Sequence, residues 1–210
     1  ICLYAVSFMA RRAHFAQFFA YLFFSIAMTN GAVLADNLVL LLFFWEGLLL
    51  VLSGQGTRLM ELMHPLPKTY RATVVWGVET DTCDLQGLSV AEGDASGLDP
   101  DRLEAALGPF LGWHDQVPPA TSAKKIGGEA AYKKAHRGEE VVLPPSRVYL
   151  QGARWLSHDL PRASVLELTC RGGFYVRSLA RDLGRALGCG AHLEALNRTA
   201  IGPWADPGPE

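Results

Sequence analysis

The pattern of hydrophobic and polar positions changes abruptly about a quarter of the way along the chain. Residues 15–34 carry no formally charged side chain, and as a helix they would cross a hydrocarbon core of ~30 Å. Arg11 and Arg12 precede this run, as basic residues often do on the cytoplasmic side of a membrane span. A second apolar run covers residues 38–52 and is interrupted only by Glu46. This pattern predicts one or two hydrophobic membrane-type helices.

The rest of the chain has the periodicities of a folded domain. Helices are predicted in three segments, residues 98–107, 129–138 and 176–188. Strands are predicted where β-branched and aromatic residues are frequent, at residues 69–80, 147–156 and 163–176. Strand pairs with helices between them indicate an α+β fold rather than a regular βαβ alternation. Residues 203–210 are predicted to be a disordered tail.

Composition narrows the classes of function. The 19 Lys and Arg against 21 Asp and Glu give a net charge of −2, so any nucleic-acid site must be a local patch. The four cysteines form no CxxC pair and no His/Cys cluster at metal spacing, which indicates reduced thiols and no metal site. Because GxGxxG and P-loop motifs are absent from the sequence, a nucleotide cofactor is not expected either.

The first segment with candidate chemistry is "KTYRATVVWGVETDTCDLQG", residues 68–87. Lys68 and Arg71 flank Tyr70 at the start of a predicted strand. A phenol ring in that place can stack on an extruded base while cations hold the phosphates. Ordinary packing of a tyrosine at a strand start is the alternative interpretation.

The second segment is "QVPPATSAKKIGGEAAYKKAHRG", residues 116–138, in which two prolines stiffen a loop before a lysine-rich turn. The helix that follows presents Lys133, Lys134 and Arg137. These cations predict either a solvated basic face or a contact with RNA.

The third segment covers residues 170–202, where a glycine pair precedes Tyr175 and a helix. Three arginines recur every four residues and share one helix face: Arg177, Arg181 and Arg185. They form either a surface stripe partnered by Asp182, or a set in which Arg177 points into a cleft and pairs with a catalytic carboxylate.

Together these three segments resemble the bacterial TruB-type tRNA pseudouridine-55 synthases, in family order and spacing, over residues 47–202. The resemblance implies a truncated mixed sheet with flanking helices, and a base-flipping isomerase that needs no cofactor. Its partner would be the T arm of tRNA. It would act in the cytoplasm, as a monomer.

The resemblance also implies roles for single residues. Tyr70 matches the tyrosine that stacks on the uracil and helps to move its proton, and Arg177 matches the arginine that pairs with the catalytic aspartate. Further positions match the pocket wall or candidate RNA contacts: Tyr175 and Leu196 for the wall, and Lys68, Lys125 and Arg198 for RNA.

The catalytic aspartate itself is not where the family has it. Its family segment reads Gly-Thr-Leu-Asp-Pro and precedes an apolar strand, and counting back from Gly47 puts the aspartate position at Leu42. Asp36 and Glu46 are the nearest acids, and moving either into place would shift the strand register. The sequence therefore predicts an inactive chain.

Residues 1–46 instead resemble a proton-antiporter-type membrane subunit of NADH:quinone oxidoreductase and hydrogenases, in which a Trp-Glu pair places a carboxylate like Glu46 inside the membrane. The prediction is a hybrid chain: a foreign hydrophobic segment at 1–46, a partial catalytic domain at 47–202 and the tail. Two alternatives stay open. One is a fragment of a membrane-embedded proton-translocating subunit, and the other is a tRNA binder without turnover.

Overall fold

The computed structural model describes residues 37–44, 47–54, 58–122, 124–137, 139 and 141–205. The chain forms two compact units, Ile1–His64 and Pro65–Glu210.

In the first unit, strands β1 (Asn37–Phe44) and β2 (Gly47–Gly54) pair antiparallel, with Phe44 opposite Gly47. A short helix, α3 (Met60–Met63), follows. The prediction of a membrane-type helix at residues 38–52 is therefore wrong. The interruption at residue 46 leaves two apolar pieces of strand length, and an apolar run of that length does not distinguish a strand from a helix by periodicity.

Among the described residues, every helix is too short or too polar to span a lipid bilayer. The predicted span at residues 15–34 and the side chain of Glu46 lie outside the described residues.

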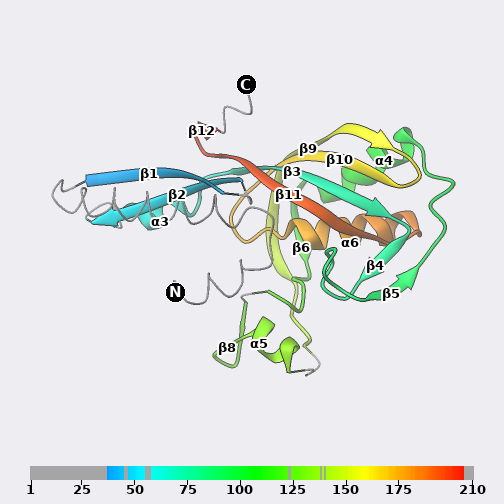
Figure 1. Cartoon of the computed structure of the whole chain (residues 1–210), viewed down its shortest axis with the longest axis horizontal. Coiled ribbons are helices and arrows are strands. Elements are labelled where there is room, and N and C mark those ends of the chain that lie inside the picture. Colours follow the sequence, from blue (N-terminus) through cyan, green and yellow to red (C-terminus); the bar gives the residue numbers. More distant parts are fainter. Residues whose placement is uncertain are drawn as a thin grey trace. The chain divides into compact units, whose positions relative to one another are not determined.

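The second unit is built on an antiparallel sheet in the order β11-β3-β10-β9-β6, with a short β12 paired to β11 (Figure 1). The strands of this sheet are β3 (Lys68–Trp76), β6 (Gly112–Gln116), β9 (Ser146–Asp159), β10 (Ala163–Cys170), β11 (Ala191–Ile201) and β12 (Trp204–Ala205). Two small sheets pair β4 (Val78–Thr80) with β5 (Ser89–Glu92), and β7 (Lys125–Ile126) with β8 (Glu129–Ala130).

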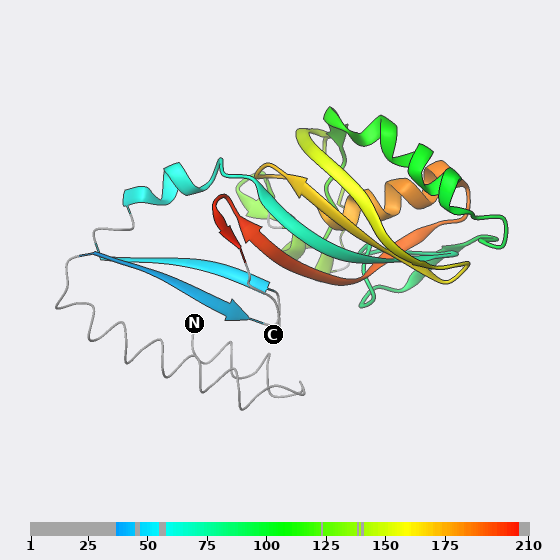
Figure 2. The same ribbon diagram turned by 90° about the horizontal axis from the view of Figure 1, so that it is seen from above.

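Two helices, α4 (Pro100–Leu107) and α6 (Val176–Leu187), cover the same face of the sheet (Figure 2). A 3-10 turn, η2 (Gly108–Phe110), follows α4, and a short helix, α5 (Ala131–His136), follows β8. Side chains on the covered face of the sheet alternate inward along β3 and β10, for example Ala72, Val74 and Leu168. They pack against Leu179 and Leu183 of α6 to form the core. This burial is the main source of the unit's stability.

The α+β class is confirmed, and two of the three predicted helices match closely. Asp99 caps α4 by accepting the backbone N–H of Arg102 at 2.9 Å, and Gly188 ends α6 with a left-handed φ of 74°. The predicted helix at 129–138 is shorter, because its first two residues form β8.

Two predicted boundaries are corrected, the end of one strand and the start of the tail. The strand expected at 163–176 ends at Cys170, because the turn that follows contains Gly173 at a φ of 86°. The tail expected from residue 203 begins with β12, in which Trp204 pairs with Ile201.

Candidate functional site

Arg177 lies in the first turn of α6, and its guanidinium group is held by several acceptors. Nη1 donates to Asp84 Oδ2 at 2.9 Å, to Thr121 Oγ1 at 3.1 Å and to the carbonyl of Thr82 at 3.4 Å. The side chains of Arg177 and Asp84 are 27% and 25% exposed, so the ion pair is shielded but reachable from solvent. Arg177 thus pairs with the carboxylate of Asp84, and its pairing with a catalytic carboxylate stays a prediction.

Asp84 is itself fixed by a tight turn that the sequence identified only as a turn. Its Oδ1 accepts the Thr82 hydroxyl at 2.6 Å and the backbone N–H of Gln86 at 3.1 Å. Cys83 adopts a left-handed φ of 61°, and its carbonyl accepts the N–H of Leu193 in β11 at 3.0 Å. The turn is thus tied to the sheet, and Asp84 is presented to α6.

A buried glutamine determines the position of the start of α6. Tyr175 is the N-cap residue, and its own side chain makes no capping bond. Gln116, 2% exposed at the end of β6, accepts the backbone N–H of Tyr175 at 2.9 Å and donates to its carbonyl at 3.1 Å. This two-point contact fixes Tyr175 beside Arg177. Apart from the Gln before the proline pair, no local pattern of residues indicates this contact.

Tyr70 lies on the covered face of the sheet, opposite Leu168 of β10 and Arg198 of β11. Burial and the nearby thiol of Cys170 raise the pKa of the Tyr70 phenol, and Arg198 opposes the rise. The phenol is therefore neutral at physiological pH. It can donate or accept a hydrogen bond as well as offer a ring face.

Lys68 and Cys170 are paired across β3 and β10 at the end of the same row. Burial lowers the pKa of the Lys68 ammonium group. Burial also raises the pKa of the Cys170 thiol to about 12, although the Lys68 charge acts against this rise. Cys170 is thus a neutral, unreactive side chain close to Tyr70.

The structure brings some of the predicted site residues together and separates others. One group lies on neighbouring strands β3 and β11: Lys68, Tyr70, Leu196 and Arg198. Tyr175 and Arg177 form a second group at the start of α6, and Phe174, just before them, packs against the same core as Tyr70. Lys125 is exposed in the separate β7–β8 hairpin, and Leu42 lies opposite Leu49 in the other unit.

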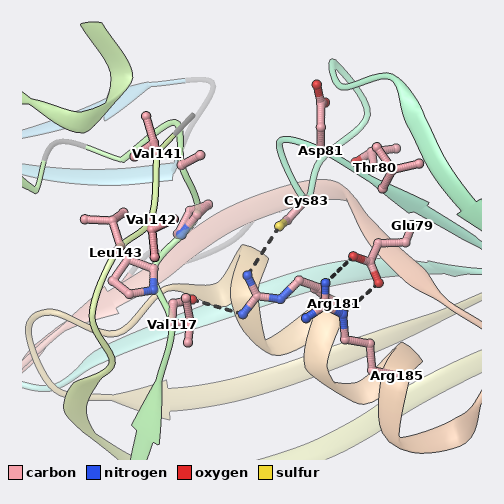
Figure 3. Close-up of a pocket in the computed structure, with 14 residues that line it drawn as sticks. Glu79, Thr80, Asp81, Cys83, Val117, Val141, Val142, Leu143, Arg181 and Arg185 are labelled. Carbon is pink, nitrogen blue, oxygen red and sulfur yellow. Dashed lines mark hydrogen bonds and ion pairs between the residues drawn. The ribbon is translucent and has the colours of Figure 1, made fainter. Parts of the chain in front are cut away.

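Beyond Arg177, the same helix face borders a cavity of about 380 Å³ (Figure 3). Arg181, 8% exposed, donates to the carbonyl of Val117 at 3.0 Å and to Asp182 at 2.8 Å. Arg185 makes two hydrogen bonds to Glu79, at 2.6 and 2.9 Å. The interpretation as a surface stripe partnered by Asp182 is corrected, because Arg181 is buried against Asp182 and Arg185 pairs with Glu79. The pairing of Arg177 with a catalytic carboxylate in a cleft stays a prediction.

The electrostatics of this cavity differ from those of an anion site. The carboxylates of Glu79 and Asp182 balance the two arginines, and burial raises the pKa of Asp182 despite the contact with Arg181. Burial also raises the pKa of the Cys83 thiol, which lies 3.9 Å from Arg181 Nη1. Across the described residues, no three His, Cys, Asp or Glu side chains are grouped so that they could hold a metal ion.

Comparison with known proteins gives two adjoining family matches. The family model "TruB family pseudouridylate synthase (N terminal domain)" matches residues 43–176, and "tRNA pseudouridylate synthase B C-terminal domain" matches residues 177–208. The first match crosses the predicted junction at residues 46 and 47. None of these findings supports a hybrid chain or a membrane subunit at its start.

Individual relatives agree with the family matches. The chain is 44% identical over 161 residues to tRNA pseudouridine synthase B of Xanthomonas axonopodis pv. citri (strain 306), which covers 77% of this chain and 52% of that protein. It is 42% identical over 164 residues to the protein of that name from Bordetella avium (strain 197N), covering 77% and 67%. The chain thus spans about half the length of the first of these relatives.

A solved structure shares the fold. The crystal structure of a Cbf5-Nop10-Gar1 complex contains a chain that is 23% identical and superposes with a TM-score of 0.53, over 77% of this chain and 40% of that chain. At this identity the likeness concerns the fold alone.

Proposed function

The chain belongs to the TruB family of pseudouridylate synthases, and from this premise we propose that its site takes a uridine flipped out of the T loop of tRNA. The reaction of the site is isomerisation of uridine-55 to pseudouridine. The bond from the sugar to N1 of uracil breaks, a bond to C5 forms, the C5 proton leaves and N1 gains a proton. No cofactor takes part in this exchange.

The observation that carries the proposal is the way Arg177 is held. A guanidinium group fixed by Asp84 and Thr121 and a quarter exposed can orient a further anionic group. On β3, Tyr70 supplies a neutral phenol with a ring face, which suits a base that has left its stack. Lys68, Lys125 and Arg198 are the proposed phosphate contacts, and Tyr175 and Leu196 are the proposed wall of the uridine pocket.

In this proposal the chain binds tRNA but turns it over poorly or not at all. The family's catalytic aspartate position falls on Leu42 in β1, and a leucine side chain has no carboxylate to act on the nucleotide. The chain would work in the cytoplasm as a monomer, with residues 47–202 as its synthase domain.

The first test is a pseudouridylation assay on unmodified tRNA that compares the chain with its Leu42→Asp variant. We expect no conversion by the unchanged chain. Conversion that disappears in Tyr70→Phe and Arg177→Gln variants would show that another acid serves the reaction, and the assignment of Leu42 would be wrong.

The second test measures binding of a T-arm hairpin RNA. Tyr70→Ala should weaken binding about fivefold to a hundredfold, because a stacked base contributes ~1–3 kcal/mol. Arg154→Gln is the matched surface control, because Arg154 is 72% exposed and pairs with Glu167 on the uncovered face of the sheet. If the hairpin does not bind the unchanged chain, the proposed function fails.

A further inference from the structure

A pair of aromatic rings lies on the uncovered face of the sheet, at the edge strand β6. Trp113 of β6 is directly opposite Tyr149 of β9, and their ring centroids are 5.1 Å apart at an interplanar angle of 54°. Trp113 is 54% exposed. The next pair along the two strands, His114 and Val148, points to the core side. Tyr149 therefore supports the Trp113 ring from one side, and solvent has access to the rest of it.

An arginine completes this surface. Arg171 Cζ lies 4.8 Å from the centroid of the Tyr149 ring and 5.8 Å from that of Trp113, and its backbone N–H donates to the Tyr149 carbonyl at 3.1 Å. The Trp113 platform consists of Trp113, Tyr149 and Arg171.

The charge of the Trp113 platform is not neutralised. Nearby Arg147 pairs with Asp115 at 3.5 Å, whereas no carboxylate in the described part of the chain pairs with Arg171. Stacking on an aromatic ring holds the guanidinium group by cation–π attraction while its N–H groups stay free for an anion.

Two short stretches of chain link the Trp113 platform to the start of α6. Trp113 precedes Gln116 by three residues of strand, roughly 10 Å, and Gln116 clamps Tyr175 at the start of α6. Arg171 leads directly into the exposed residues Gly172 and Gly173, which Phe174 and Tyr175 follow. RNA binding by the Trp113 platform requires an RNA strand to run from Tyr175 past these glycines to Trp113.

We propose that the Trp113 platform binds unpaired nucleotides that flank the RNA hairpin held in the site, by stacking a base on Trp113 and pairing a phosphate with Arg171. The inference rests on the proposed function. An exposed aromatic face beside an unpaired cation is the usual arrangement for single-stranded nucleic acid, and it tolerates any base because every base has a π face. The cation favours a phosphate over an apolar protein segment as occupant.

The experiment compares a T-arm hairpin RNA with the same hairpin carrying short single-stranded uridine extensions at both ends. Binding is measured with the full chain and its variants by fluorescence anisotropy. The extended RNA should bind more tightly than the plain hairpin. Trp113→Ala should remove this advantage, a loss of about fivefold to a hundredfold, whereas Trp113→Phe should retain most of it because it keeps a ring.

Arg171→Gln should make the slope of log affinity against log salt shallower by about 0.7 for the extended RNA, the value for one phosphate on a single strand. Arg154→Gln removes the same charge from the same sheet face and should leave this slope unchanged. Circular dichroism, recorded at the temperature of the binding measurement, checks that each variant is folded.

Two outcomes would overturn the inference while the proposed function stands. In the first, the hairpin binds, Tyr70→Ala weakens it, and Trp113→Ala binds the extended RNA as well as the unchanged chain does. In the second, Trp113→Ala weakens both RNAs equally, so the ring does not contact the unpaired flank. Failure of the plain hairpin to bind any form would instead contradict the proposed function itself.

Discussion

Asp84 determines both the local turn and the charge of the candidate site. Its carboxylate accepts from Thr82 and Gln86 on one oxygen and from Arg177 on the other. The aspartate therefore both closes its own turn and neutralises the first arginine of α6. Any anionic group that binds Arg177 must share it with Asp84, so Asp84 limits how strongly the site attracts charge.

Asp84→Asn should lower the free energy of unfolding by about 1–2 kcal/mol, because it removes a charge-assisted hydrogen bond that is only partly exposed to water. The measurement is urea denaturation at neutral pH. Asp115→Asn is the matched control: its ion pair with Arg147 is 3.5 Å long, with side chains 64% and 61% exposed. It should cost less than about 0.5 kcal/mol. Equal losses in the two variants would contradict the structural role of Asp84.

Cys170 gives a prediction about pH. Burial raises the pKa of its thiol from 9.0 to about 12 in the folded chain. Above the pKa of the unfolded state, the unfolded chain loses this proton and the folded chain keeps it. The contribution of the thiol to the free energy of unfolding is therefore fully present below about pH 9 and is lost as pH rises toward about 12. One such group contributes a slope of at most about 1.4 kcal/mol per pH unit.

The measurement is urea denaturation at about pH 8 and about pH 10.5, the window set by this shift. Cys170→Ala should show a smaller difference between the two pH values than the unchanged chain. Leu168→Ala, a buried neighbour on β10 without a titrating group, should lower stability equally at both. A Cys170→Ala variant with the full alkaline loss would show that other groups cause it.

At the scale of elements, helix α6 could be predicted almost completely. Its arginine spacing indicated one shared helix face, and Gly188 marked its end. By contrast, β6 and β11 were not predicted. In β11 the inward residues Ala191 and Leu193 are followed by a bulge near Ala195, so the alternation of a strand is broken halfway. β6 contains a histidine and a glutamine on its inward side, which conceals its pattern.

Single residues of the candidate site could be predicted, but their partners could not. Tyr70 and Arg177 were identified from short motifs, but their partners depend on pairing between distant strands and turns. Asp84 meets Arg177 through a contact across 93 residues, and Gln116 meets Tyr175 across 59. The local sequence does not encode such registers, and the position of Arg198 opposite Tyr70 follows only from the pairing of β11 with β3.

Helix α6 approaches β11 so closely that one glycine decides the packing. A Cβ at Gly184 would lie 2.2 Å from the backbone nitrogen of Ala191 and 2.6 Å from its Cβ. Gly184→Ala should therefore destabilise the second unit by about 3 kcal/mol, since backbone atoms cannot move aside cheaply. Gly152→Ala is the control, because nothing lies within 4 Å of its added Cβ, and it should change stability by less than about 0.5 kcal/mol. Thermal or urea denaturation distinguishes the two, and an undamaged Gly184→Ala variant would contradict the described contact.

For the whole molecule, charge is balanced rather than concentrated. A net charge of −2 provides no long-range attraction for RNA, so the proposed contacts must act at short range. Within the second unit, many arginines are already paired, including Arg154, Arg162 and Arg185. The cations proposed to bind phosphates are few: Lys68, Lys125, Arg171 and Arg198.

This small number predicts a weak dependence of RNA binding on salt. Four phosphate contacts give a slope of log affinity against log salt of about −3 to −4. The slope is measured with the extended T-arm RNA over a series of potassium chloride concentrations. Lys125→Gln should make it shallower by about one unit, because Lys125 is exposed on the β7–β8 hairpin. Arg147→Gln removes a cation that already pairs with Asp115 and should leave the slope nearly unchanged. A slope of about −7 or steeper for the unchanged chain would require an extended basic surface, and the proposed set of contacts would then be wrong.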